Sequence, residues 1–219
     1  EASVLVGDFL FARSFVLMVK NGSLKVLDIL ARASAVIAEG EVMQLATAND
    51  MATTEQAYLD VIMAKTAALF GAASHIGAVI ADRPEADEFA LRDYGLHLGT
   101  AFQLIDDVLD YSAHQATLGK TVGDDFRDGK VTLPVIIAYA KGDDDEKAFW
   151  RRCMEDQNFE DGDLDHAQML IRKYNTLEAT MDRAREYGQL AINDLATFPD
   201  GQIKDAMIEA VEFCISRPY

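Results

Sequence analysis

Proline is scarce in this chain, and its scarcity places the strongest limit on the fold. Only four of the 219 residues are proline, at positions 84, 134, 199 and 218. A proline inside a helix costs about 3 kcal/mol, because it lacks an amide hydrogen and clashes with the preceding turn. Each proline lies where a helix would begin or end, and the intervals between them are helix-sized or multiples of that length. We therefore expect a chain built from helices.

Apolar residues recur at spacings of three and four, which places them on one face of a helix. Leu24, Leu27 and Leu30 form one such run, and Leu177, Met181 and Ala184 begin another. Sustained strand alternation is absent from the sequence. The pattern predicts an all-α fold in one domain over residues 1–219, with helices near residues 3–20, 23–48, 54–81, 85–112, 132–141, 144–156, 163–174, 177–197 and 201–216.

The chain is strongly acidic, with 20 Lys and Arg against 37 Asp and Glu and a formal net charge of -17. Such a surface repels nucleic acids and anionic membranes. Cys153 and Cys214 lie too far apart in sequence to suggest a disulfide framework. No uninterrupted apolar run approaches the roughly 18 residues that cross a bilayer. We expect a soluble cytoplasmic protein without a nucleic-acid partner or an integral membrane segment.

One expected helix carries an acidic stripe near its end. Gln103, Asp106, Asp107 and Asp110 stand at positions i, i+3, i+4 and i+7 and share a face. Like charges at this spacing repel by about 0.2–0.5 kcal/mol per pair, and no lysine or arginine lies within the stripe. A solvated acidic face is the alternative. Carboxylates without histidine or thiolate partners suit Mg²⁺, which also binds substrate phosphates, and we favour a magnesium site.

A long irregular segment, Ser112 to Val131, follows the stripe. Loops of this length in a compact domain are often functional. Gly119, Gly123 and Gly129 allow close bends, while Lys120 and Lys130 return positive charge to an acidic region. Solvated lysines, and aspartates that merely cap turns at positions 124, 125 and 128, are the alternative interpretation.

A third element is the pair Lys65-Thr66, which lies among small and apolar residues. A lysine in a buried helix needs an anionic partner, since an unpaired ammonium group is costly to bury. The alternative is a lysine that extends its side chain along the helix to solvent. His75, His97, His114 and His166 share no metal-ligand spacing.

The order of these motifs resembles that of the trans-isoprenyl (polyprenyl) diphosphate synthase family, and the likeness covers essentially the whole chain. It is most like the long-chain octaprenyl and decaprenyl type that supplies quinone side chains. The matching motifs are Gly7-Asp8, Glu39-Gly40-Glu41 with Gln44, Lys65-Thr66, Phe102-Gln103 with Asp106-Asp107 and Asp110, Gly119-Lys120, and Gly123-Asp124-Asp125 to Gly129-Lys130.

The resemblance implies an isoprenoid-synthase-type helical bundle, here incomplete at the N-terminus. The family's first aspartate-rich motif would precede Gly7, together with the basic residues that hold isopentenyl diphosphate. We therefore expect this polypeptide alone to be inactive in condensation. The resemblance also implies a homodimer.

The implied reaction is magnesium-assisted ionisation of an allylic diphosphate, followed by attack of isopentenyl diphosphate and loss of a proton. By resemblance, Asp106 binds Mg²⁺ directly, while Asp107 and Asp110 hold metal-bound waters. Lys65, Asp106 and Lys120 form the implied catalytic set. The implied substrate-binding residues are Lys65, Thr66, Gln103, Lys120 and Lys130.

The sequence leaves one other function open and argues against a second. One is a non-catalytic synthase-like subunit or dimerisation module, which would need no chemistry of its own. The retained lysines and the self-repelling stripe favour the enzyme over this module. The other is a terpene cyclase, which would replace the stripe with a mixed ligand set that the sequence lacks.

Overall fold

The computed structural model describes residues 2–112 and 123–216, which contain helices and no strand. The all-α prediction is therefore confirmed for this part of the chain. The elements are α1 (Ala2–Asn21), α2 (Leu24–Thr47), α3 (Glu55–Ile62), a π-helical turn (Met63–Ala67, the π turn), α4 (Ala68–Ile80), α5 (Glu85–Tyr111), α6 (Asp124–Arg127), α7 (Leu133–Lys141), α8 (Asp144–Met154), α9 (Asp163–Lys173), α10 (Thr176–Asp194) and α11 (Gln202–Ser216).

Two elements differ from the sequence prediction. The expected helix over residues 54–81 is interrupted by the π turn, and the expected irregular segment Ser112 to Val131 contains the short helix α6. Both depend on contacts with distant residues. A Cβ atom on Gly40 of α2 would lie 2.6 Å from the backbone nitrogen of Lys65 in the π turn, and the carboxylate of Asp110 accepts hydrogen bonds from the first backbone amides of α6.

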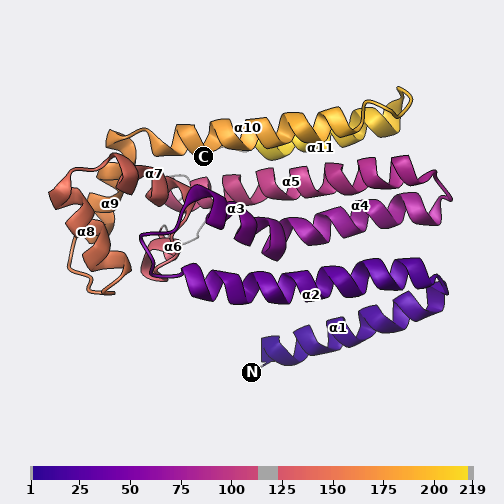
Figure 1. Cartoon of the computed structure of the whole chain (residues 1–219), viewed down its shortest axis with the longest axis horizontal. Helices are drawn as coiled ribbons and strands as arrows, with labels where there is room; N and C mark the ends of the chain where they lie inside the picture. Colours follow the sequence, from indigo (N-terminus) through magenta and orange to yellow (C-terminus); the bar gives the residue numbers. More distant parts are fainter. Residues whose placement is uncertain (1, 113–122, 217–219) are drawn as a thin grey trace.

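The long helices form a stack with α5 near its centre. Figure 1 shows α2, the α3–α4 segment, α5 and α10 running along the long axis, with α6 to α9 gathered at one end. Helix α5 packs against α4 on one side and α10 on the other, while α2 packs against α4 and the π turn. The C-terminal part of α5 therefore lies close to the end where α6 begins.

The buried apolar face of α5 determines the direction in which the acidic residues near its C-terminal end point. Leu104, Ile105 and Val108 are fully buried and pack in one cluster with Tyr58 of α3 and Met181 of α10. Burying a side chain of this size contributes about 1.5–3 kcal/mol. This apolar face holds α5 in a single rotation about its axis, so the polar residues between these positions have defined directions.

Helices α4 and α5 approach each other closely at two glycines of α5. A Cβ atom on Gly99 would lie 2.7 Å from the Cα atom of Ala67, the last residue of the π turn, and a Cβ atom on Gly95 would collide with the carbonyl oxygen of Phe70 on α4. Real side chains essentially never make such contacts with a neighbouring backbone. The absence of a side chain at these positions therefore sets the distance between the two helices.

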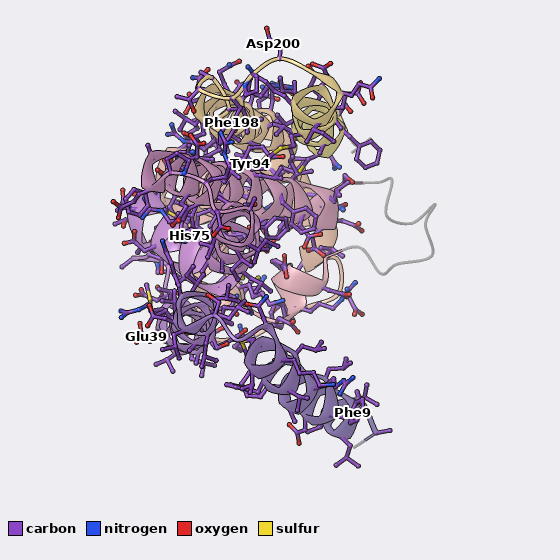
Figure 2. All side chains as sticks on the ribbon, turned by 90° about the vertical axis from the view of Figure 1, so that its right-hand side faces the viewer. Phe9, Glu39, His75, Tyr94, Phe198 and Asp200 are labelled. Atoms are coloured by element: carbon purple, nitrogen blue, oxygen red, sulfur yellow. The ribbon has the colours of Figure 1, made fainter. Side chains whose placement is uncertain are left out.

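Two helical segments are long and apolar enough to cross a membrane by length and composition alone: Ala2–Asn21 and Glu55–Ile80. Such helices are weak evidence for a membrane segment, because the core helix of a soluble protein meets the same criterion. The second segment packs against α2 and α5 within the protein, which accounts for its apolar character. The first, α1, stands at one extreme of the molecule with Phe9 projecting outward (Figure 2), and Phe9 is 67% exposed.

We expect Gly95→Ala to lower the free energy of unfolding by about 1–3 kcal/mol, because the added methyl group forces α4 and α5 apart. Gly77→Ala on α4 is the matched control, since nothing lies within 4 Å of its Cβ position. There, alanine should stabilise the protein by about 0.5–1 kcal/mol through its higher helix propensity. Urea unfolding of both variants measures the difference, and equal effects would contradict the close-packing explanation.

A partly buried ion pair joins α8 to α9. The guanidinium group of Arg152 donates hydrogen bonds of 2.8 and 2.7 Å to the two oxygens of Asp163, which also accepts one of 2.7 Å from the backbone nitrogen of Glu160. The hydrogen bond from Arg152 is the main reason that the pKa of Asp163 falls from 3.8 to about 2. Because this pKa is lower in the folded state, the ionised carboxylate stabilises the fold.

This stabilisation should be complete above the unfolded pKa near 3.8 and disappear as the pH falls through about 2. We expect Asp163→Asn to lower the free energy of unfolding at pH 7 by about 1.5–3 kcal/mol, the usual contribution of a hydrogen bond to a charged group. The difference from the unsubstituted chain should shrink between pH 4 and pH 2. Denaturant titrations at several pH values test this, with the exposed Asp161→Asn as control.

Candidate functional site

Most of the described residues that the sequence singled out line one cavity. This cavity has a volume of about 270 Å³ and lies among α2, α3, the π turn, α5, α6 and the segment that leads into α7. Five predicted site residues line it: Lys65, Gln103, Asp106, Asp107 and Lys130. Thr66 and Asp110 are not among its lining residues, and Lys120 lies outside the described residues.

The cavity also contains polar residues that were not chosen from the sequence. Gln44, Tyr58, Asp125 and Thr132 are among its lining residues. Tyr58 lies seven residues before Lys65, and the spacing of two helical turns was a usable signal for a shared face. Asp125 was part of one motif shared with the family and of a possible set of turn caps, but no role in the site was predicted for it. Its position in the cavity shows that the acidic lining comes from α6 as well as α5.

The three aspartates of the α5 stripe have different environments. Asp106 is exposed, whereas Asp107 is only 3% exposed and Asp110 only 7%. The helical spacing was correct, but the neighbouring elements cover two of the three carboxylates. Only Asp106 presents its carboxylate to solvent.

Asp107 is held by neutral donors on both of its oxygens. The hydroxyl of Tyr58 donates to one oxygen at 2.6 Å, and the amide of Gln103 donates to the other at 2.9 Å. Burial raises the pKa of Asp107 to about 7, and the hydrogen bond from Tyr58 opposes this shift. Burial and the charge of Asp107 raise the pKa of the Tyr58 hydroxyl well above its usual value, so this group remains a proton donor.

Gln103 links Asp107 to the π turn. Its side-chain oxygen accepts a hydrogen bond of 2.9 Å from the hydroxyl of Thr66, while its nitrogen donates to Asp107. The amide of Gln103 is therefore engaged at both ends within the protein. The diphosphate-binding roles of Gln103 and Thr66 remain predictions from the family resemblance.

Asp110 connects α5 to α6. Its carboxylate accepts hydrogen bonds of 3.2 and 3.1 Å from the backbone nitrogens of Asp124 and Asp125, and its carbonyl accepts one of 2.9 Å from Gly123. Burial and the charge of Asp125 raise the pKa of Asp110 to about 6, against the effect of these backbone hydrogen bonds. Asp110 thus positions α6, and its role with metal-bound water stays a prediction.

Both described lysines of the site have acidic partners. Lys65 donates to the side-chain oxygen of Gln44 at 2.5 Å and pairs with Glu41 at 3.1 Å. Lys130 pairs with Asp125 at 2.7 Å and with Asp128 at 3.2 Å. Burial alone would lower the pKa of Lys130, but its bonds to these aspartates raise it overall. The anionic partner expected for Lys65 is therefore present on α2.

The side chains of the cavity fit a magnesium ion that shares its coordination with waters and phosphate. They do not fit a metal ion that is coordinated by protein side chains alone. Within residues 2–112 and 123–216, no three histidine, cysteine, aspartate or glutamate side chains are arranged to hold an ion. Asp106, Asp107 and Asp125 nevertheless line the same cavity. Mg²⁺ is commonly bound by one or two carboxylates and completed by waters and substrate phosphates. The cavity can accommodate this type of coordination when a phosphate ligand is present.

A second, mainly apolar cavity of about 550 Å³ lies between α2, α4 and α5. Met63 and Ala64, directly before Lys65 in the chain, are part of its lining. On the α4 side, three small residues and His75 line the cavity, and the small residues leave space between the helices. These small lining residues are Ala68, Gly71 and Ala72. An apolar cavity therefore begins next to the charged one.

Comparison with known proteins agrees with these observations. A family model described as polyprenyl synthetase matches residues 1–171. The octaprenyl diphosphate synthase of Haemophilus influenzae is 44% identical over 218 residues, covering 100% of this chain and 66% of that protein. The Escherichia coli octaprenyl diphosphate synthase is 43% identical, covering 99% of this chain and 67% of that protein. The chain spans about two-thirds of the length of these relatives.

Solved structures give the same result. A polyprenyl synthase from Caulobacter crescentus, complexed with calcium and isoprenyl diphosphate, has a TM-score of 0.94 and 50% identity, covering 99% of this chain and 66% of that one. A decaprenyl diphosphate synthase from Rhodobacter capsulatus has a TM-score of 0.91 and 51% identity, covering 97% and 66%. These matches confirm the isoprenoid-synthase fold. The chain belongs to the polyprenyl synthetase family.

Proposed function

We propose that this chain carries the diphosphate site of a long-chain trans-polyprenyl diphosphate synthase, which joins an allylic diphosphate to isopentenyl diphosphate. The observation that carries the proposal is the charged cavity itself. It brings the carboxylates of Asp106, Asp107 and Asp125 together with the ammonium groups of Lys65 and Lys130. Carboxylates for a divalent cation beside lysines for phosphate oxygens form the donor set that a magnesium diphosphate complex requires.

In this proposal, Asp106 would hold Mg²⁺ directly, since its carboxylate is exposed. Asp107 and Asp125 would accept hydrogen bonds from metal-bound waters. The bound cation would neutralise charge that develops on the leaving diphosphate. Lys65 and Lys130 would donate to diphosphate oxygens after exchanging their present acidic partners for the substrate. The same exchange explains how an acidic protein can bind an anion.

The apolar cavity supports an isoprenoid substrate. A tail attached to a diphosphate near Lys65 would meet Met63 and Ala64, which line the second cavity. Its volume of about 550 Å³ is within the range of small-molecule sites, about 300–1,000 Å³. A polyprenyl product for quinone side chains, as suggested by the octaprenyl and decaprenyl relatives, is part of this proposal.

The cellular setting belongs to the same proposal. We place the enzyme in the cytoplasm as a homodimer. Support for the dimer comes from α1, whose exposed apolar side chains would gain stability in a subunit contact. Among its exposed side chains are Val4, Leu5, Phe9, Leu10, Phe11 and Leu17.

The first test is calorimetric titration with farnesyl diphosphate in the presence and absence of Mg²⁺. We expect magnesium-dependent binding that weakens at least tenfold in Asp106→Asn, about the effect of losing 1.4 kcal/mol of interaction. Asp205→Asn, at an exposed position of α11, makes the same charge change away from the cavity and should bind normally. If the chain fails to bind the diphosphate under any condition, the non-catalytic subunit becomes the better description.

A second test concerns Lys65. We expect Lys65→Met to weaken binding of inorganic pyrophosphate about tenfold or more, because a hydrogen bond to a charged group contributes about 1.5–3 kcal/mol. Thermal stability should change little, since exposed ion pairs contribute at most about 1 kcal/mol. Lys20→Met, at the end of α1, is the control. Equal pyrophosphate binding by both variants would exclude Lys65 from the binding site.

A further inference from the structure

We propose that Tyr58 is a positioning residue for Asp107 and that its hydroxyl is required for full magnesium-dependent binding of the diphosphate. This inference rests on the proposed function. Tyr58 would act through the carboxylate of Asp107, without touching the substrate. No role was assigned to Tyr58 from the sequence, although it lines the charged cavity.

The geometry around Asp107 supports this role. Its two oxygens receive separate donors, one from Tyr58 on α3 and one from Gln103 on α5. Both Tyr58 and Asp107 are buried, with exposed fractions of 5% and 3%. A carboxylate that accepts a hydrogen bond on each oxygen cannot rotate without breaking one of them. The orientation of Asp107 toward the cavity is therefore determined by Tyr58 and Gln103 together.

The π turn completes the arrangement. Lys65 extends to Gln44 and Glu41 of α2, whereas the next residue, Thr66, donates to Gln103 of α5. Two adjacent residues of the π turn thus contact different helices: Lys65 contacts α2 and Thr66 contacts α5. Single π turns within α-helices often occur at functional sites. The hydrogen bonds from Thr66 to Gln103, and from Gln103 and Tyr58 to Asp107, form one connected network.

The hydroxyl of Tyr58 can be removed with little change in packing. Its ring lies in the apolar cluster with Leu104 and Ile105, and phenylalanine would occupy the same space. Without the hydroxyl, one oxygen of Asp107 loses its donor and the carboxylate is free to turn. Removing a partner that orients a metal-site ligand typically reduces metal affinity by about 10–100-fold. The lysine contacts with phosphate would remain.

The experiment is calorimetric titration of the chain with inorganic pyrophosphate, with and without Mg²⁺, in three forms: unsubstituted, Tyr58→Phe and Tyr94→Phe. Tyr94 is the matched control, because it is equally buried on α5 and its hydroxyl donates to the carbonyl of Met207 at 3.0 Å. We expect Tyr58→Phe to bind pyrophosphate at least tenfold more weakly than the unsubstituted chain when Mg²⁺ is present. Without Mg²⁺, the two should bind pyrophosphate equally. Tyr94→Phe should match the unsubstituted chain in both conditions.

The outcomes separate the inference from the proposed function. Magnesium-independent binding by the unsubstituted chain would overturn the proposed function. Magnesium-dependent binding that is equal in all three forms would overturn only the role of Tyr58, as would an equal loss with and without Mg²⁺. Thr66→Val serves as a second variant if Tyr58→Phe folds poorly. It removes the donor to Gln103 and should reduce the affinity measured with Mg²⁺ while the affinity without Mg²⁺ is retained. An equal loss in both conditions, as expected if Thr66 itself contacts the diphosphate, or an unchanged affinity would overturn the inference.

Discussion

The arrangement of the site depends on the burial of one face of α5. Leu104, Ile105 and Val108 are fully enclosed by residues of α3, α7 and α10, so the helix cannot rotate without exposing them. The acidic residues between these positions are held at the end of the stack where α6 begins. Asp110 then holds α6 against α5, because its carboxylate accepts hydrogen bonds from the first backbone amides of α6. A single apolar interface thus fixes acidic groups on two separate elements.

Electrostatic balance inside the charged cavity differs from that of the whole protein. The chain has a formal net charge of -17, but Lys65 and Lys130 bring two ammonium groups to the cavity wall, each paired with acidic groups. These pairs keep the lysines in place before a ligand arrives. A phosphate could replace the paired carboxylates without the cost of burying an isolated charge. Of these carboxylates, that of Asp125 lines the cavity and would then be available to a divalent cation.

Much of the fold could be predicted because helix formation depends on local patterns. The periodic apolar residues and the proline positions were sufficient to place the long helices, including α2, α5 and α10, within a few residues of their observed bounds. The site was predicted less completely. Spacing correctly placed Asp106 and Asp107 at one cavity, but it did not identify Tyr58 or Asp125. Tyr58 could have been found from its two-turn spacing to Lys65, but its hydrogen bond to Asp107 joins segments that are distant in sequence.

The sequence by itself determined the helical class and the acidic stripe, because both depend on local spacing. It also determined the order of motifs that marks the family, because that order is read directly along the chain. The tertiary structure decided which carboxylate is exposed and which are buried, and which partners hold Lys65 and Lys130. It also shows a π turn within the helix expected over residues 54–81, where Gly40 of α2 packs directly against the backbone. These outcomes depend on helix-to-helix distances, which result from packing across the whole chain.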